Sequence, residues 1–121
     1  MVKLTPEQRG KALLYSWLTP AQRRQLVSGY FDVSGCDSGA RYRIHTYGVS
    51  GNVRQLDASG AEVAGYCCYP YDMYTLPSHD VWLAQALAIT ADEKAFLRMA
   101  VKIHMAPRYG ATHRRWFLLR L

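Results

Sequence analysis

The chain has 121 residues, a length that favours one domain with a single hydrophobic core. Its 50% hydrophobic and 20% charged residues argue against a largely disordered chain, and no apolar run approaches the ~20 residues that a membrane-spanning helix needs. The first residues lack the apolar core of a signal peptide, and the three cysteines, an odd number, argue against a disulfide framework. We therefore expect a cytoplasmic protein.

Positive charge is concentrated at the C-terminal end of the chain. All nine acidic residues lie within residues 1–93, together with eight Lys or Arg. Residues 94–121 contain no acid and seven cations, which are Lys94, Arg98, Lys102, Arg108, Arg114, Arg115 and Arg120. This asymmetry indicates an anionic partner, which is nucleic acid, an acidic protein surface or a membrane surface.

Two similar segments, LTPEQR at residues 4–9 and LTPAQR at residues 18–23, each predict the start of a helix. In both, a Thr precedes a Pro at the first helical position, and a Gln three residues after the Thr completes a capping box. We expect helices over residues 6–18 and 20–28, the second ending at Gly29. The side chains predicted to be buried are Leu13, Leu14, Trp17, Leu18, Leu26 and Val27.

The segment between residues 30 and 69 has the pattern of an antiparallel β-meander. Strands are predicted at residues 30–33, 41–47, 52–57 and 62–69, with Gly-containing turns between them. The second strand alternates, with Tyr42, Ile44 and Thr46 on one face and Arg41, Arg43, His45 and Tyr47 on the other. One face of such a sheet packs on helices, and the other can face water.

Two further helices are predicted after the sheet. Ser78 is expected to cap a helix ending near residue 89, and Thr90 with Glu93 forms a capping box for a helix to about residue 104. The sequence therefore predicts an α+β fold, in which a three- to four-stranded antiparallel β-meander is flanked by two N-terminal helices and two C-terminal helices. We expect a single domain over residues 1–121, with a basic C-terminal extension over about residues 105–121.

Candidate metal ligands are few, namely Cys36, the adjacent pair Cys67 and Cys68, and His79. A zinc site needs about four such ligands, and adjacent residues on a strand point to opposite faces of the sheet. We therefore predict that one cysteine of the pair lies in the core and the other is partly exposed, and that the protein holds no metal or other cofactor.

Catalytic patterns are weak. Ser78, His79 and Asp80 are neighbours at a helix start, where side chains diverge, so we interpret Ser78 as a cap rather than as the nucleophile of a triad. Asp72 and His79 are a conceivable acid/base pair across the connector between sheet and helix. The glycines lie at turns and match no phosphate-binding loop.

Two groups of cations suit a polyanion. Arg41, Arg43 and His45 share a strand face, which resembles in outline a sheet on which bases stack, although an ordinary solvated face has the same pattern. The stronger group is C-terminal and consists of Arg108, Arg114, Arg115, Trp116 and Arg120, with Lys102 ahead of it. Arginines with an aromatic suit phosphates, an acidic protein surface, or a solubilising tail whose aromatics pack on the core.

We therefore predict a small non-enzymatic binding protein that engages nucleic acid through its basic C-terminal region, with a possible contribution from Arg41 and Arg43. The alternative is a protein–protein adaptor or inhibitor, of the kind that small bacterial accessory and mobile-element genes encode, binding an acidic protein surface. A small enzyme acting near Asp72 and His79 is the third interpretation.

Overall fold

The structure, a computed structural model, describes residues 2–46, 51–68 and 76–103. Within these residues it has four helices and one five-stranded antiparallel sheet, which confirms the predicted α+β class. The helices are α1 (Pro6–Trp17), α2 (Pro20–Val27), α3 (Ser78–Ala91) and α4 (Glu93–Met99). The strands, which lie side by side in chain order, are β1 (Tyr30–Ser34), β2 (Arg41–His45), β3 (Val53–Leu56), β4 (Glu62–Cys67) and β5 (Val101–Ile103).

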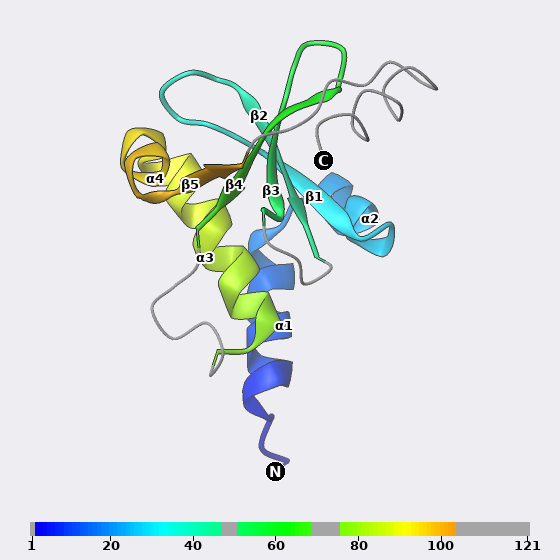
Figure 1. Cartoon of the computed structure of the whole chain (residues 1–121). Coiled ribbons are helices and arrows are strands. Elements are labelled where there is room, and N and C mark those ends of the chain that lie inside the picture. Colours follow the sequence, from blue (N-terminus) through cyan, green and yellow to red (C-terminus); the bar gives the residue numbers. More distant parts are fainter. Residues whose placement is uncertain (1, 47–50, 69–75, 104–121) are drawn as a thin grey trace, which may run out of the picture.

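Figure 1 shows α2 beside β1 on one side of the sheet and α4 beside β5 on the other, with α1 alongside α3. α3 packs on β1 and β2, and α1 packs on α3. Within the described ranges, no helix is both long enough and apolar enough to span a bilayer.

Both predicted capping boxes at the N-terminal end are confirmed. The Gln8 amide N–H donates to Thr5 Oγ1 at 3.1 Å, and the Thr5 N–H donates to Gln8 Oε1 at 2.8 Å. Thr19 and Gln22 repeat this arrangement at the start of α2. Each box satisfies helix N–H groups that have no carbonyl partner within the helix, which stabilises a helix start by about 1 kcal/mol.

The core lies between one face of the sheet and the helices. Partners in adjacent antiparallel strands share a face, so Ile44 opposite Phe31 and Tyr42 opposite Val33 all point to the core. The buried cluster consists of Leu14, Leu18, Phe31, Val33, Tyr42, Ile44, Val53, Ala64, Tyr66, Leu83, Ala86, Ile89 and Phe96. The predicted alternation of β2 is therefore confirmed over Arg41–His45, whose burial alternates along the strand.

The burial predicted for two residues is wrong. Leu13 is 57% exposed and Val27 is 89% exposed. Of the residues of α1, only Gly10 and Leu14 are buried, because the helix rests on α3 along a narrow stripe. Helical spacing identified a set of apolar residues, but the width of the buried stripe depends on how many elements the helix touches.

The C-terminal helix is shorter than predicted. α4 ends at Met99, and Val101–Ile103 forms β5, which pairs with β4 and adds a strand to the expected three or four. The β-branched residues Val101 and Ile103 favour an extended chain, and the edge of β4 supplies backbone partners. Periodicity alone could not show this, because the strand depends on an edge formed about 35 residues earlier in the chain.

Two predicted helix caps are also wrong. The Thr90 hydroxyl bonds to the Ala86 carbonyl at 2.8 Å within α3, and Asp92 caps α4 by accepting from the Ala95 N–H at 3.1 Å. At the start of α3, Pro77 occupies the cap position and no side chain caps the helix. Glu93, predicted as part of the capping box, is buried instead.

A pair of buried amides joins α3 to the sheet. Asn52 and Gln85, each 3% exposed, bond reciprocally, with Nδ2 to Oε1 at 2.8 Å and Nε2 to Oδ1 at 3.0 Å. The same nitrogens donate to the carbonyls of His45 at 3.1 Å and Cys68 at 2.9 Å. All four amide N–H groups therefore have partners, so the pair is buried without an unsatisfied donor.

Candidate functional site

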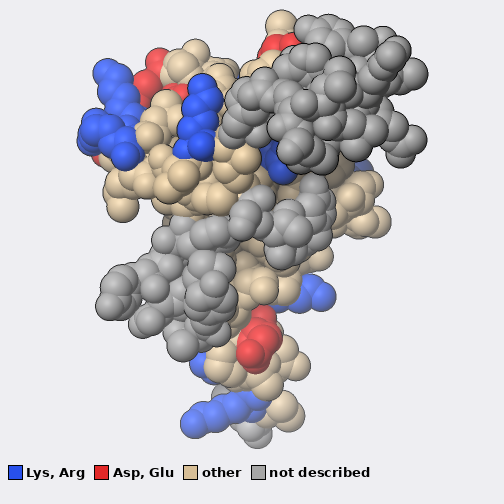
Figure 2. All heavy atoms as spheres, in the orientation of Figure 1, with Lys and Arg blue, Asp and Glu red and all other residues tan. Residues whose placement is uncertain are grey.

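One group of exposed cations in the described chain lies on α4 and β5. Lys94, Arg98 and Lys102 are exposed, and Lys94 and Arg98 are four residues apart, so they share one face of α4. Within the described residues none of the three forms an ion pair with a carboxylate. Figure 2 shows Lys and Arg side chains over this corner of the molecule, with Asp and Glu side chains among them. We call these three cations the α4–β5 surface.

Apolar side chains lie between these cations in the sequence. Leu97 is 38% exposed, Met99 76% and Val101 67%. The corner therefore combines positive charge with accessible apolar area, a composition that suits contact with a macromolecule better than simple solvation.

Glu93 fixes the start of α4, because its carboxylate accepts hydrogen bonds from four donors. Oε1 accepts from the backbone N–H groups of Asp37 at 3.0 Å and Ser38 at 2.8 Å. Oε2 accepts from the Ser38 hydroxyl at 2.6 Å and the Tyr42 hydroxyl at 2.7 Å. The residue is 2% exposed, yet each oxygen has two donors, as a buried carboxylate requires. We call this arrangement the Glu93 clasp.

Opposing effects set the pKa of Glu93. Burial by itself would raise it, but the hydrogen bonds from Ser38, Tyr42 and the backbone of residues 37 and 38 outweigh burial and lower the pKa to about 2. Burial and then the same hydrogen bond raise the pKa of Tyr42, which keeps its hydroxyl protonated as a donor. The clasp is therefore ionised on Glu93 and neutral on Tyr42 at physiological pH.

The loop between β1 and β2 is shaped to receive α4. Gly35 is buried, and a Cβ atom there would overlap the Glu93 carboxylate. The Lys94 N–H donates to Asp37 Oδ2 at 3.1 Å, and the Glu93 N–H donates to Cys36 Sγ at 3.3 Å. Because these contacts hold the backbone of α4, the side chains of Lys94 and Arg98 extend from a fixed support.

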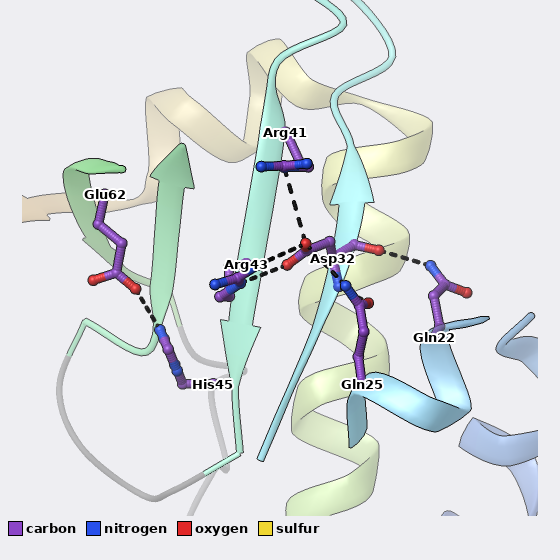
Figure 3. A network of polar contacts seen from close by, with 7 residues as sticks. All are labelled: Gln22, Gln25, Asp32, Arg41, Arg43, His45 and Glu62. Carbon is purple, nitrogen blue, oxygen red and sulfur yellow. Dashed lines mark hydrogen bonds and ion pairs between the residues drawn. The ribbon is translucent and has the colours of Figure 1, made fainter. Parts of the chain in front are cut away.

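The predicted cationic strand face carries its own acids, as Figure 3 shows. Arg43 donates to Asp32 through Nε at 2.8 Å and Nη2 at 3.1 Å, and its guanidinium lies 3.9 Å from the centroid of the Tyr30 ring. The hydrogen bond to Asp32 raises the pKa of Arg43. Arg41 Nε lies 3.9 Å from Asp32 Oδ2, and this side chain is 49% exposed.

The rest of this face is also of mixed charge. His45 Nε2 lies 2.7 Å from Glu62 Oε2, and Arg54 Nη1 lies 3.5 Å from Glu62 Oε1. The structure thus brings Arg41, Arg43 and His45 to one face, as predicted, but places carboxylates among them. The Tyr30 ring, which lies beside these cations, is already covered by Arg43.

Two glutamines of α2 complete the network around Asp32 (Figure 3). The Asp32 N–H donates to Gln25 Oε1 at 2.9 Å, and Gln22 Nε2 donates to the Asp32 carbonyl at 2.8 Å. β1 is an edge strand, so these backbone groups point away from β2. The glutamines therefore occupy the backbone N–H and carbonyl of Asp32 at the sheet edge, which blocks pairing with another strand there.

The predicted C-terminal site residues divide into two sets. Lys102 lies on β5 and is exposed. The others lie outside the described residues and are Arg108, Arg114, Arg115, Trp116 and Arg120. The clasp at Glu93 was missed, since an acid in the first turn of a helix has the same sequence pattern whether it is solvated or buried.

The candidate ligands and acid/base residues do not converge within the described chain. No group of three His, Cys, Asp or Glu suited to a metal ion occurs there. Cys36 lies in the β1–β2 loop, whereas Cys68 packs on the core and burial raises the pKa of its thiol. His79 stacks edge-on against Trp82 with ring centroids 5.0 Å apart, and Asp72 lies outside the described residues.

Comparison of this chain with protein-family models, with curated proteins and with solved structures found no match.

Proposed function

We propose that the protein is a small non-enzymatic binding protein that engages nucleic acid through its basic C-terminal region, residues 94–121. The observation that carries this proposal is the exposure of Lys94, Arg98 and Lys102 without a carboxylate partner in the described chain. Four more arginines follow in the sequence without any acid, so the sequence continues this positive charge beyond β5. A run of unpaired cations attracts the phosphates of a polyanion.

The contrast with the sheet supports this choice of surface. Arg43 is held by Asp32 and Tyr30, so a phosphate would have to compete with a bidentate ion pair. Arg41 is half exposed and lies 3.9 Å from Asp32. It is therefore the cation of that face best suited to an additional contact with a phosphate. Base stacking on Tyr30 would displace Arg43, which argues for binding through phosphates more than through bases.

The test is a fluorescence anisotropy titration of the full chain with labelled DNA and RNA at low and high salt. Affinity should fall steeply with salt, because each neutralised phosphate releases condensed counterions and contributes about −0.9 to the slope of log K against log salt. Arg114→Glu with Arg115→Glu should abolish binding and leave the midpoint of thermal unfolding nearly unchanged. Failure of the wild-type chain to bind at low salt would overturn the proposal.

The second candidate is an adaptor or inhibitor that binds an acidic protein surface. The observation that favours it is the exposed apolar set Leu97, Met99 and Val101 beside the cations, since exposed apolar area rimmed by polar residues is typical of protein-interaction sites. Met99→Ser with Val101→Thr separates the two functions. These changes should leave phosphate-driven binding to nucleic acid intact but weaken a protein complex, which a pull-down from the native host would detect.

An enzyme acting near Asp72 and His79 is the third candidate. Burial, followed by the charge of Lys11, lowers the pKa of His79, so the imidazole is neutral at physiological pH. A neutral imidazole can accept a proton, but its placement against Trp82 is equally that of a packed helix residue.

A further inference from the structure

We propose that α1 and α2 form a second phosphate-binding surface, made by Lys3, Lys11, Arg23 and Arg24, which contacts the same nucleic acid at a distance from the α4–β5 surface. This inference rests on the proposed function and adds a second contact to it.

The charge of the N-terminal helices is as one-sided as that of the C-terminal region. Residues 1–29 contain one acid, Glu7, and five cations, which are Lys3, Arg9, Lys11, Arg23 and Arg24. All five cations are exposed, and none forms an ion pair with a carboxylate among the described residues. Residues 30–93 contain three arginines and eight acids, so two basic regions flank an acidic one.

The corner between α1 and α2 holds part of this charge in place. Lys11 Nζ lies 5.6 Å from the centroid of the Tyr15 ring, and Arg23 Nε donates to the Tyr15 carbonyl at 2.8 Å. Tyr15 is 36% exposed. Arg23 uses one of its five N–H groups in this bond, so the others can reach a phosphate. A lysine beside an accessible aromatic ring, with an arginine nearby, is a combination that suits nucleic-acid backbones and bases.

The α1 part of the N-terminal surface and the α4–β5 surface lie at different ends of α3, whereas α2 packs on β1. Gly10 of α1 lies against Pro77 and Asp80 at the start of α3, whereas α4 follows its end. Figure 1 shows α4 beside one end of α3, with the first turns of α1 toward its other end. With 14 residues, α3 spans ~21 Å at 1.5 Å per residue. A duplex that rises about 3.4 Å per base pair covers this separation in about six base pairs.

The test compares two triple variants of the full chain that remove the same amount of charge. One is Lys3→Gln, Lys11→Gln and Arg24→Gln, and the other is Lys94→Gln, Arg98→Gln and Lys102→Gln. All six positions are exposed, and no described hydrogen bond uses their side chains. Each variant is titrated with a hairpin of about three base pairs, which is shorter than the separation of the two surfaces, and with a duplex of about 24 base pairs, which reaches both.

The N-terminal variant should bind the long duplex about tenfold more weakly than wild type, and its salt slope should fall by about three. Its affinity for the short hairpin should change by less than about twofold, because residues 94–121 still hold that ligand. The C-terminal variant should bind both ligands more weakly. The matched charge change excludes a general loss of attraction as the cause of this difference.

If the N-terminal variant binds the long duplex with the affinity and salt slope of wild type, the second surface is refuted and the proposed function stands. Equal losses on both lengths would also overturn it, since the effect would then follow net charge alone. Absence of binding by the wild-type chain would instead remove the proposed function itself. Thermal unfolding of each variant tests whether the fold is retained. If Lys11→Gln disturbs α1, Lys3→Gln with Arg24→Gln replaces that triple and is compared with Lys94→Gln with Lys102→Gln, which removes the same charge.

Discussion

The Glu93 clasp makes a strong prediction about how stability depends on pH. Folding lowers the pKa of Glu93 from 4.5 to about 2, and the residue is 2% exposed. A difference of about 2.5 pKa units corresponds to ~3 kcal/mol of folding free energy when the group is ionised in both states. Because the folded pKa is the lower one, this contribution is present above about pH 4.5 and is lost as the pH falls toward 2.

The assay is urea unfolding of wild type and Glu93→Gln at pH 7 and pH 3. At pH 7 the substitution should lower the free energy of unfolding by about 3 kcal/mol, because Gln is neutral and can keep one acceptor oxygen for the loop. At pH 3, which lies between the folded and the unfolded pKa, the wild-type carboxylate retains only about half of this contribution, so the two proteins should differ by about half as much.

A matched control is Glu7→Gln, since Glu7 is an exposed acid in the first turn of α1. This change should cost less than about 0.5 kcal/mol at either pH. A Glu93→Gln effect below about 0.5 kcal/mol at pH 7, or one of equal size at both pH values, would refute the reasoning that hydrogen bonds to the ionised carboxylate outweigh its burial.

Three further predictions test other parts of the structure. Gly35→Ala should destabilise the fold by about 1–3 kcal/mol in urea unfolding, since the added methyl overlaps the Glu93 carboxylate, and no effect would contradict this contact. Gln85→Ala should cost about 2–4 kcal/mol, because it leaves Asn52 and the Cys68 carbonyl unpaired in the core; recovery by Asn52→Ala would confirm their coupling in a double-mutant cycle. Arg43→Gln should change nucleic-acid affinity by less than about twofold, because Arg43 is bound to Asp32, whereas a full unit lost from the salt slope would show that it contacts phosphate.

Local patterns predicted much of the fold because the interactions that they encode are local. The Thr–Pro–x–Gln segments specify two helix starts through bonds that span three residues, and the structure contains both. The alternation of β2 follows from strand geometry alone, so Tyr42 and Ile44 were correctly placed in the core. The basic surface on α4 and β5 was likewise visible as an excess of cations without acids.

Contacts between distant segments were beyond this reasoning. Arg43 appeared as an exposed cation, because its partner Asp32 lies 11 residues away and only the register of β1 with β2 brings the two together. Glu93 was predicted as part of a capping box with Thr90, because its actual donors lie more than 50 residues earlier in the chain. Neither pairing leaves a signature in the nearby sequence.

The sequence by itself determined the starts of α1 and α2, the two faces of β2 and the one-sided charge of residues 94–121. Only the tertiary structure decided which cations have no carboxylate partner and can bind an anion. An ion pair depends on the distance between two side chains, and strand register and helix packing set that distance. It also decided that Val101–Ile103 is a strand, since an edge strand exists only where a neighbour offers its backbone groups.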